Sequence, residues 1–263
     1  EVYKHSERWN GIDSLDGKTI IVYCEQGFGD TIQFCRYFSL FKNCEVILHC
    51  PLKLHRLLSQ FKFKMIDRND PNIPKHDFHV LSMSLPFCFE EGAEIKHPYI
   101  HIIEKTDLHE LNLPDDIIKI GIKWEGNPEH SNNEIRCCPL IFFKKLADKF
   151  PKIRFFALHN VFHNLNYLDG CDDLELYSST SEDFYDTAMF INAMDMIITT
   201  DTSALHLAGA LNKKTIGLLS NPCDERWNIN INWYPSVEFI KQDLEGDWEL
   251  VFYKLENYLT NLF

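Results

Sequence analysis

The fold of this chain is decided by two short segments, Glu25-Gln26-Gly27-Phe28-Gly29-Asp30-Thr31 and Thr200-Asp201-Thr202-Ser203-Ala204-Leu205-His206. Each follows an apolar, β-branched run that is typical of a buried strand, and each begins a run with helical apolar periodicity. Backbone N–H groups point outward at such a strand-to-helix turn, where anions or reacting groups can be held. We therefore expect two α/β halves that face each other across a cleft.

Composition limits the classes of function. The 263 residues suffice for one large domain or two small ones. The net charge of −13 argues against nucleic acid as a partner, because phosphate contacts need clustered Lys and Arg. No apolar run is long enough to span a bilayer, and no signal-peptide pattern is seen. The nine cysteines include no C-x-x-C pair and mostly lie in apolar runs, which is typical of reduced thiols in a cytoplasmic protein.

Alternating strand and helix patterns predict repeated βαβ units in both halves. In the first half we expect strands at 18–24, 45–50, 63–66 and 78–81, and helices at 30–42 and 51–60. In the second half we expect strands at 118–124, 153–158, 174–177, 196–199 and 215–219, and helices at 140–150, 182–191, 203–211 and 248–259. The polar stretch 104–116 reads as a linker, so we expect domains at 1–113 and 114–263. Two doubly wound sheets would place ligands at the carboxyl ends of their strands.

The first turn does not carry a complete dinucleotide fingerprint. The third glycine is replaced by Ile32, and no acidic residue ends the second strand. An NAD-type enzyme is therefore not favoured. The simplest interpretation of Asp30 is an N-cap, worth about 1 kcal/mol, with Gln33 in the position of a capping box. A carboxylate at such a turn can also face a ligand.

The second turn supports two interpretations. Asp201 and Thr202 can simply cap the helix that follows. Alternatively, the N–H groups of Thr202, Ser203 and Ala204 cradle a diphosphate, helped by the helix dipole. His206 lies one turn further on, within reach of a ligand at the start of the helix, although a lone helical histidine is more often structural.

A polar loop runs from Lys123 through Asn127 to Arg136 and brings cations to the start of the second half. It can be a solvated loop, or Arg136 can make a bidentate contact with a phosphate. No metal site is expected: His130 has no second ligand at the right spacing, and His159 and His163 lack the glutamate of a zinc-protease helix. Four late aromatic residues fit core packing, with base stacking by one of them as the alternative. They are Trp227, Trp233, Tyr234 and Trp248.

Several matching segments, in a fixed order, cover nearly the whole chain. They are 9–37 (WNG…EQGFGDTIQFCRY), 84–86 (SLP), 98–100 (PYI), 121–130 (GIKWEGNPEH) with Arg136, 183–188 (DFYDTA), 195–211 (DMIITTDTSALHLAGAL), 226–227 (RW), 233–236 (WYPS) and 246–248 (GDW). Together they resemble the glycosyltransferase domain of bacterial tetratricopeptide-repeat proteins, which is related to the ADP-heptose:lipopolysaccharide heptosyltransferases. The chain departs from that pattern at Asn133, where the family usually has Asp, and at Lys241, where it commonly has Arg. The family's repeats are absent from the chain.

The resemblance implies an α/β fold of the GT-B class, with two Rossmann-like domains facing a central cleft. It implies metal-independent, inverting transfer of a sugar from a nucleotide-diphosphate sugar, without a cofactor, and Asp30 as the general base on the acceptor hydroxyl. An ADP-heptose-like donor and a hydroxyl of a protein or glycan acceptor are favoured. The donor-side residues are Lys123, Asn127, Arg136, Asp201, Thr202, Ser203, Ala204 and His206. The acceptor-side residues are Glu25, Gln26, Gly29, Gln33 and Ser84.

Elementary chemistry agrees with this division of roles. Direct displacement at a sugar needs a base on the acceptor and charge stabilisation on the diphosphate leaving group. An ionised Asp30, and a positive helix end with Arg136, would supply both without a metal. Two alternatives stay open on sequence grounds, a module that binds a nucleotide sugar without transferring it and a nucleotide-sugar epimerase. Neither the base nor the sugar of the donor can be read from the sequence, and the acceptor is equally undetermined.

Overall fold

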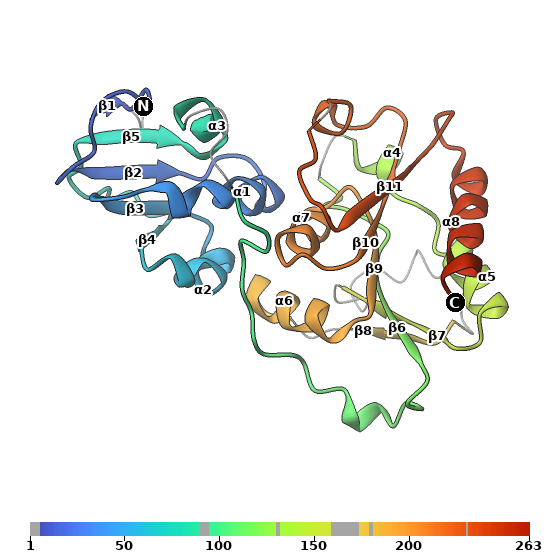
Figure 1. Ribbon diagram of the computed structural model, residues 1–263. Helices are drawn as coiled ribbons and strands as arrows, with labels where there is room; N and C mark the ends of the chain where they lie inside the picture. Colours follow the sequence, from blue (N-terminus) through green and yellow to red (C-terminus); the bar gives the residue numbers. More distant parts are fainter. Residues whose placement is uncertain (1–5, 90–94, 130–131, 159–173, 179–180, 230) are drawn as a thin grey trace. The chain divides into compact units, whose positions relative to one another are not determined.

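The computed structural model describes residues 6–89, 95–129, 132–158, 174–178, 181–229 and 231–263. Its contacts divide the chain into two compact units (Figure 1). The first unit comprises Glu1–His101 with Glu182–Tyr185, and the second comprises Ile102–Ser181 with Asp186–Phe263. The two units are described separately below. The sequence-based domain boundary after residue 113 stays a prediction.

The first unit is built on a five-stranded parallel sheet with the order β1-β5-β2-β3-β4. Its strands are β1 (Glu7–Arg8), β2 (Thr19–Tyr23), β3 (Glu45–Cys50), β4 (Lys64–Asp67) and β5 (Phe78–Leu81). Its helices are α1 (Phe28–Phe34), which continues as a 3-10 helix to Leu40, α2 (His55–Leu58) and α3 (Leu85–Cys88). From β2 the chain first winds outward through β3 and β4 and then returns to β5 on the other side of β2. The strand order therefore reverses between β2 and β5.

The second unit holds a six-stranded parallel sheet with the order β11-β10-β9-β6-β7-β8. Its strands are β6 (Ile118–Lys123), β7 (Ile153–Ala157), β8 (Leu176–Ser178), β9 (Met196–Thr200), β10 (Thr215–Leu219) and β11 (Val237–Lys241). Counted within the unit, this is the 3-2-1-4-5-6 order of a Rossmann sheet. The order reverses between β6 and β9.

Helices cover both faces of the second sheet. They are α4 (Asn133–Arg136), α5 (Ile141–Lys149), α6 (Phe184–Ala193), α7 (Ser203–Ala210) and α8 (Trp248–Leu262). In Figure 1, α5 and α8 lie on one side of the sheet and α7 on the other. The core between the sheet and the α5–α8 pair includes Phe143, Phe155 and Phe252, all buried. Strands covered on both faces are apolar throughout, which is why they could be recognised as continuous apolar runs.

The start of α1 differs from the prediction. The helix begins at Phe28, with Gly27 as its N-cap in an extended conformation, and not at Asp30. Asp30 occupies the third helical position, and its Oδ2 accepts the backbone N–H of Gly27 at 3.0 Å. The prediction of Asp30 as N-cap was therefore wrong, as was that of Gln33 as the capping-box partner. The physical requirement is the same in both arrangements, because the first N–H groups need an acceptor. The Asp30 carboxylate provides this acceptor from the third position of the helix.

Candidate functional site

Most of the predicted site residues lie at the two places where strand order reverses. In the first unit, Tyr23 at the end of β2 pairs with Leu81 at the end of β5. In the second unit, Lys123 at the end of β6 pairs with Thr199 of β9. In doubly wound sheets, ligands bind outside the carboxyl ends of the strands at such a reversal of strand order. Each unit thus presents one candidate binding surface.

Glu25 joins the two turns at the carboxyl ends of β2 and β5 in the first unit. Its carboxylate accepts the N–H and hydroxyl of Ser82, both at 2.9 Å, and the N–H of Met83 at 3.1 Å. These bonds join the turn after β2 to the 3-10 turn Ser82–Ser84 after β5. Gln26, the next residue, has a φ of +66°, and its carbonyl accepts a hydrogen bond from Arg68 Nη1 at 2.8 Å. The turn that carries Asp30 is therefore fixed from both sides.

The other predicted acceptor-side residues occupy different surroundings. Gly29 lies in the first turn of α1 beside Asp30, whereas Gln33 is fully buried inside that helix. Ser84 accepts a hydrogen bond from Arg8 Nη2 at 3.0 Å. The structure thus brings Glu25, Gln26, Gly29 and Asp30 to one turn. Their contact with an acceptor stays a prediction.

In the second unit, the start of α7 offers backbone donors. Thr202 is the N-cap, with extended backbone, and its hydroxyl lies 3.2 Å from that of Thr199 rather than capping the helix. No described side chain caps α7, so the N–H groups of its first turn, including those of Ser203 and Ala204, remain available to a ligand or to water.

Arg136 joins the polar loop to this helix start. It ends the short helix α4, and its Nη1 donates to the carbonyl oxygen of Asp201 at 3.2 Å. Its Nε is buried and has no hydrogen-bond partner among the described residues. Gly126 lies directly against the guanidinium, since a Cβ at that position would come within 2.4 Å of Nη2. A guanidinium that is fixed at one nitrogen and unsatisfied at another is suited to an anion.

Asn133 orders the same loop. Its Oδ1 accepts the N–H of Gly126 at 3.1 Å, and the residue is nearly fully buried. A carboxylate would accept this bond equally well, so the departure from the family's Asp leaves this contact intact. Asn127 lies on the exposed part of the loop, where its Oδ1 accepts the N–H of Glu129 at 3.1 Å.

Lys123 adds a second cation at the end of β6. Burial lowers the pKa of its ammonium from 10.5 to about 8, although the carboxylate of Glu125 acts in the opposite direction. The neighbouring Thr200 hydroxyl donates to the Lys123 carbonyl at 3.4 Å, which ties β6 to β9 at this point.

Asp201 and His206 are held by aromatic side chains from the segment after β10. The indole N–H of Trp227 donates to Asp201 Oδ2 at 2.9 Å. His206 is buried, its Nδ1 lies 2.8 Å from the Tyr234 hydroxyl, and its ring stacks on Trp227. Burial raises the pKa of Asp201. These aromatic residues were expected to pack in the core, and the contacts of Trp227 with two site residues were not foreseen.

The structure therefore gathers Lys123, Arg136, Asp201, Thr202, Ser203 and Ala204 at the carboxyl ends of β6 and β9. His206 lies one turn further along α7. Sequence reasoning missed the part that Glu125 and Trp227 take in this surface. Trp227 could have been found from its position, because it lies in the connection that follows β10. That strand is next to β9 in the sheet, so its carboxyl end lies beside the candidate site.

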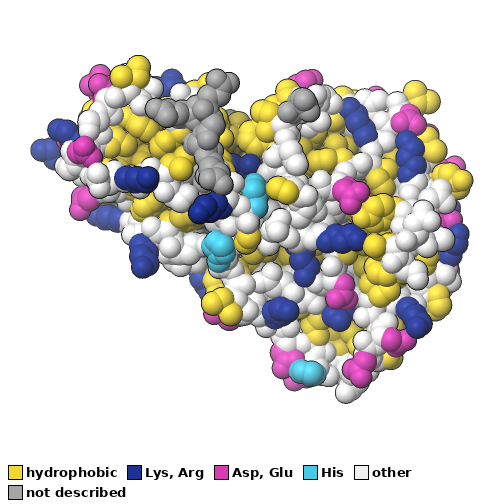
Figure 2. Space-filling view, viewed as in Figure 1, with side chains coloured by type: hydrophobic (Ala, Val, Ile, Leu, Met, Phe, Trp, Pro, Cys, Tyr) yellow, Lys and Arg dark blue, Asp and Glu magenta, His cyan; other side chains and the backbone are white. Residues whose placement is uncertain are grey.

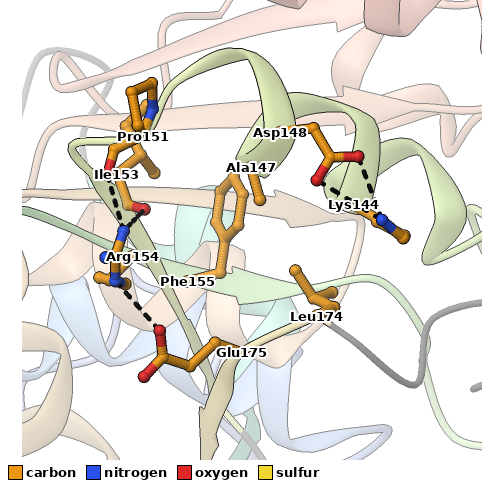
Figure 3. A pocket seen from close by; sticks show the side chains of 9 residues that line it. All are labelled: Lys144, Ala147, Asp148, Pro151, Ile153, Arg154, Phe155, Leu174 and Glu175. Atoms are coloured by element: carbon orange, nitrogen blue, oxygen red, sulfur yellow. Dashed lines mark hydrogen bonds and ion pairs between the residues drawn. The ribbon is translucent and has the colours of Figure 1, made fainter.

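A cavity of about 230 Å³ in the second unit lies elsewhere. It is lined by Lys144, Ala147, Asp148, Pro151, Ile153, Arg154, Phe155, Leu174 and Glu175 (Figure 3). Most of these belong to the end of α5 or to the amino ends of β7 and β8, the sheet edge opposite the candidate site. Two ion pairs, Lys144–Asp148 and Arg154–Glu175, border it. This cavity is not part of the candidate site.

The charged side chains of the second unit are of mixed sign. On the visible face of the second unit, Lys and Arg are interspersed with Asp and Glu (Figure 2). Among the described residues, no group of three or more His, Cys, Asp or Glu side chains could hold a metal ion. His130, His159 and His163 lie outside the described residues. No helix in the described part of the chain has the length and apolarity needed to cross a membrane. The eight described cysteines are free thiols.

No protein-family model and no curated protein matches this chain. Among solved structures it is similar to Escherichia coli ADP-heptose LPS heptosyltransferase II, with a TM-score of 0.66 and 11% identity over 92% of this chain and 99% of that one. A glycosyl transferase of family 9 from Veillonella parvula gives a TM-score of 0.61 and 14% identity, covering 94% and 93%. The E. coli heptosyltransferase WaaC with ADP has a TM-score of 0.57 and 10% identity, over 92% of this chain and 99% of that one. These similarities confirm the predicted α/β fold, two Rossmann-like parallel sheets as in the GT-B heptosyltransferases.

Proposed function

We propose that this protein is an inverting, metal-independent glycosyltransferase that moves a sugar from a nucleotide-diphosphate sugar to a hydroxyl of a protein or glycan. An ADP-heptose-like donor is favoured, since two of the similar structures are named for ADP-heptose or hold ADP. We further propose that the domain is of the type associated with tetratricopeptide repeats and works in the cytoplasm.

One observation carries this proposal. Arg136 joins the polar loop to the start of α7 through the Asp201 carbonyl, and its buried Nε has no described partner, while the first-turn N–H groups of the helix are uncapped by any described side chain. In a chain of net charge −13, a site for a diphosphate has to be built from local donors. Fixed donors also stabilise the charge that develops on a nucleotide-diphosphate leaving group.

The remaining donor-side residues divide by charge. Lys123 and Arg136 suit the phosphates, whereas a carboxylate would repel them. Asp201 is therefore assigned to the hydroxyls of the donor sugar, from which it can accept hydrogen bonds. His206 is buried against Trp227 and Tyr234, so we assign it the support of this surface rather than a step in the chemistry.

On the acceptor side, Asp30 is assigned the role of general base. Its Oδ2 accepts the Gly27 N–H, but a carboxylate has about four lone-pair sites and can accept a hydroxyl proton as well. Glu25 is less suited, because its carboxylate already accepts three hydrogen bonds that hold the turn together.

A thermal-shift screen tests the donor class. We expect one family of ADP-, UDP-, GDP- or CMP-sugars to raise the melting temperature at millimolar concentration, with ADP-heptose as the favoured ligand, because binding to the folded state alone stabilises it. Nucleotide release in the presence of acceptor would then identify a transferase. Stabilisation without any release would indicate a binding module, and a changed sugar without acceptor an epimerase. If no nucleotide sugar stabilises the protein, the proposal fails.

The titration of the Lys123 ammonium should make donor binding depend on pH. Because the pKa of its ammonium is about 8, the positive charge is present below pH 8 and is lost as the pH rises through that value. We expect the affinity for ADP to fall between about pH 7.5 and 9, measured by calorimetry. The Lys123→Arg variant is the control, because arginine stays charged throughout this range. An identical decline in that variant would show that another group titrates.

A further inference from the structure

Trp227 contacts two of the residues assigned to the donor side. It lies in the 3-10 turn Glu225–Trp227, and its indole N–H donates to Asp201 Oδ2 at 2.9 Å. The indole also stacks on His206, with ring centroids 5.5 Å apart and planes inclined at 29°. The other carboxylate oxygen, Asp201 Oδ1, has no hydrogen-bond partner among the described residues. The two oxygens of this carboxylate are therefore not equivalent.

We propose that Trp227 is a positioning residue for Asp201: its indole N–H holds Oδ2, so that Oδ1 is the oxygen presented to a sugar hydroxyl of the donor. The hydrogen bond also fixes the plane of the carboxylate, which would otherwise rotate. The assignment to a sugar rests on the proposed function. The fixed orientation of the carboxylate does not.

The indole itself is firmly held. Asp224 Oδ1 accepts the N–H of Arg226 at 2.9 Å and caps the turn that carries Trp227. The Trp227 ring lies against Phe239 of β11, with centroids 4.9 Å apart. On the same segment, the indole N–H of Trp233 donates to the Arg226 carbonyl at 3.2 Å. A donor fixed in this way loses little entropy when it makes its hydrogen bond.

The effect of Trp227 on Asp201 can be measured through the pKa of the Asp201 carboxyl. Burial raises the pKa of this carboxyl, and the charge of Asp224 acts in the same direction. The Trp227 N–H, Arg226 and Arg136 lower it. Because the indole donates to the ionised form, its removal should raise the pKa of Asp201 further.

The first test follows the Asp201 carboxyl in the full, unliganded chain by carbon-13 NMR, with Asp201→Asn to assign the signal. We expect Trp227→Phe to raise its titration midpoint by about one pH unit, since a hydrogen bond to a charged group is worth about a tenfold change in equilibrium. Trp9→Phe is the control, because it removes an indole N–H that donates to the Asp13 carbonyl at 2.9 Å in the first unit and takes no part in the contacts of Trp227 or Asp201. We expect it to titrate like the wild type. An unchanged midpoint in Trp227→Phe would overturn the proposal. If Trp227→Phe does not fold, Trp227→Met takes its place in this test, because methionine also lacks the indole N–H.

The second test measures binding of ADP-heptose and of ADP by calorimetry. We expect Trp227→Phe to weaken ADP-heptose binding about tenfold and to leave ADP binding nearly unchanged, because Oδ1 is assigned to the sugar. The fall in affinity towards acidic pH should also begin about one pH unit higher than in the wild type. Equal weakening of both ligands would mean that Trp227 only supports the fold of the site, and would overturn the positioning role. If the wild type binds neither compound, the proposed function fails, and the NMR titration alone decides the orientation of Asp201.

Discussion

Asp30→Asn is expected to reduce sugar transfer by about 10²- to 10⁴-fold while donor binding persists. General-base catalysis by a positioned side chain contributes acceleration of this order, and an amide cannot take the acceptor's proton. The loss should appear in kcat, measured as nucleotide release with saturating donor and acceptor. The affinity for ADP, measured by calorimetry, should stay within about twofold of the wild type, because the donor residues belong to the second unit.

The substitution separates chemistry from folding. The Asn side chain keeps an oxygen that can accept the Gly27 N–H, which the Asp30 carboxylate accepts at 3.0 Å. Asp30→Asn should therefore melt close to the wild type, whereas Asp30→Ala should also lose about 1 kcal/mol of stability with that bond. Asp247→Asn is the matched control, since Asp247 accepts the Leu250 N–H at the start of α8 in the second unit. Full turnover in Asp30→Asn would eliminate Asp30 as the base.

Much of the fold was predictable because the sheets are parallel. Strands buried on both faces read as continuous apolar runs, and the bounds of β3, β5 and β10 agree with the prediction to the residue. The central strand β2 shows why: four of its five residues are buried. Helix positions followed from the helical periodicity of apolar residues. The errors are larger at the helix ends, where tertiary contacts decide which residue caps the helix.

Two of the four edge strands of the described sheets, β1 and β11, were missed because they lack such an apolar run. Among the described strands β11 pairs with β10 alone, and three of its five residues are charged or exposed, so its sequence lacks a continuous apolar run. β1 has two residues, both exposed, and is a strand only because it pairs with β5. Neither carries a local signal. Both are defined by the neighbour that they meet in the folded chain.

The site was predictable in part. A strand-to-helix turn has a recognisable pattern, so the turn after β2 and the start of α7 were located from sequence. The bond between Trp227 and Asp201 joins residues 26 positions apart and depends on the path of the chain after β10. The same holds for Arg136 and Asp201, 65 positions apart. A sequence can suggest that such residues belong to a site, but which atoms meet is determined only by tertiary packing.

Arg136→Ala is expected to weaken ADP binding about 10- to 100-fold. A hydrogen bond to a charged group contributes about 1.5–3 kcal/mol, and the phosphates have few other cations available in an acidic chain. The variant also removes the bond to the Asp201 carbonyl, which joins the polar loop to α7. Arg136→Lys keeps the charge but loses the planar donor fork, so an intermediate affinity is expected. Calorimetry at two salt concentrations measures both variants, and the salt dependence should become shallower in Arg136→Ala.

Arg154→Ala makes this test specific. It removes the same charge from the opposite edge of the same sheet, where Arg154 Nε lies 3.2 Å from a carboxylate oxygen of Glu175. If Arg136 acts by contact with the diphosphate, Arg154→Ala should bind ADP like the wild type. If the total charge alone matters, the two variants should weaken binding equally, because each removes one positive charge. That second result would contradict a built phosphate site at α7, whereas a difference of tenfold or more between the variants would show that the loss is local to Arg136 and its surroundings.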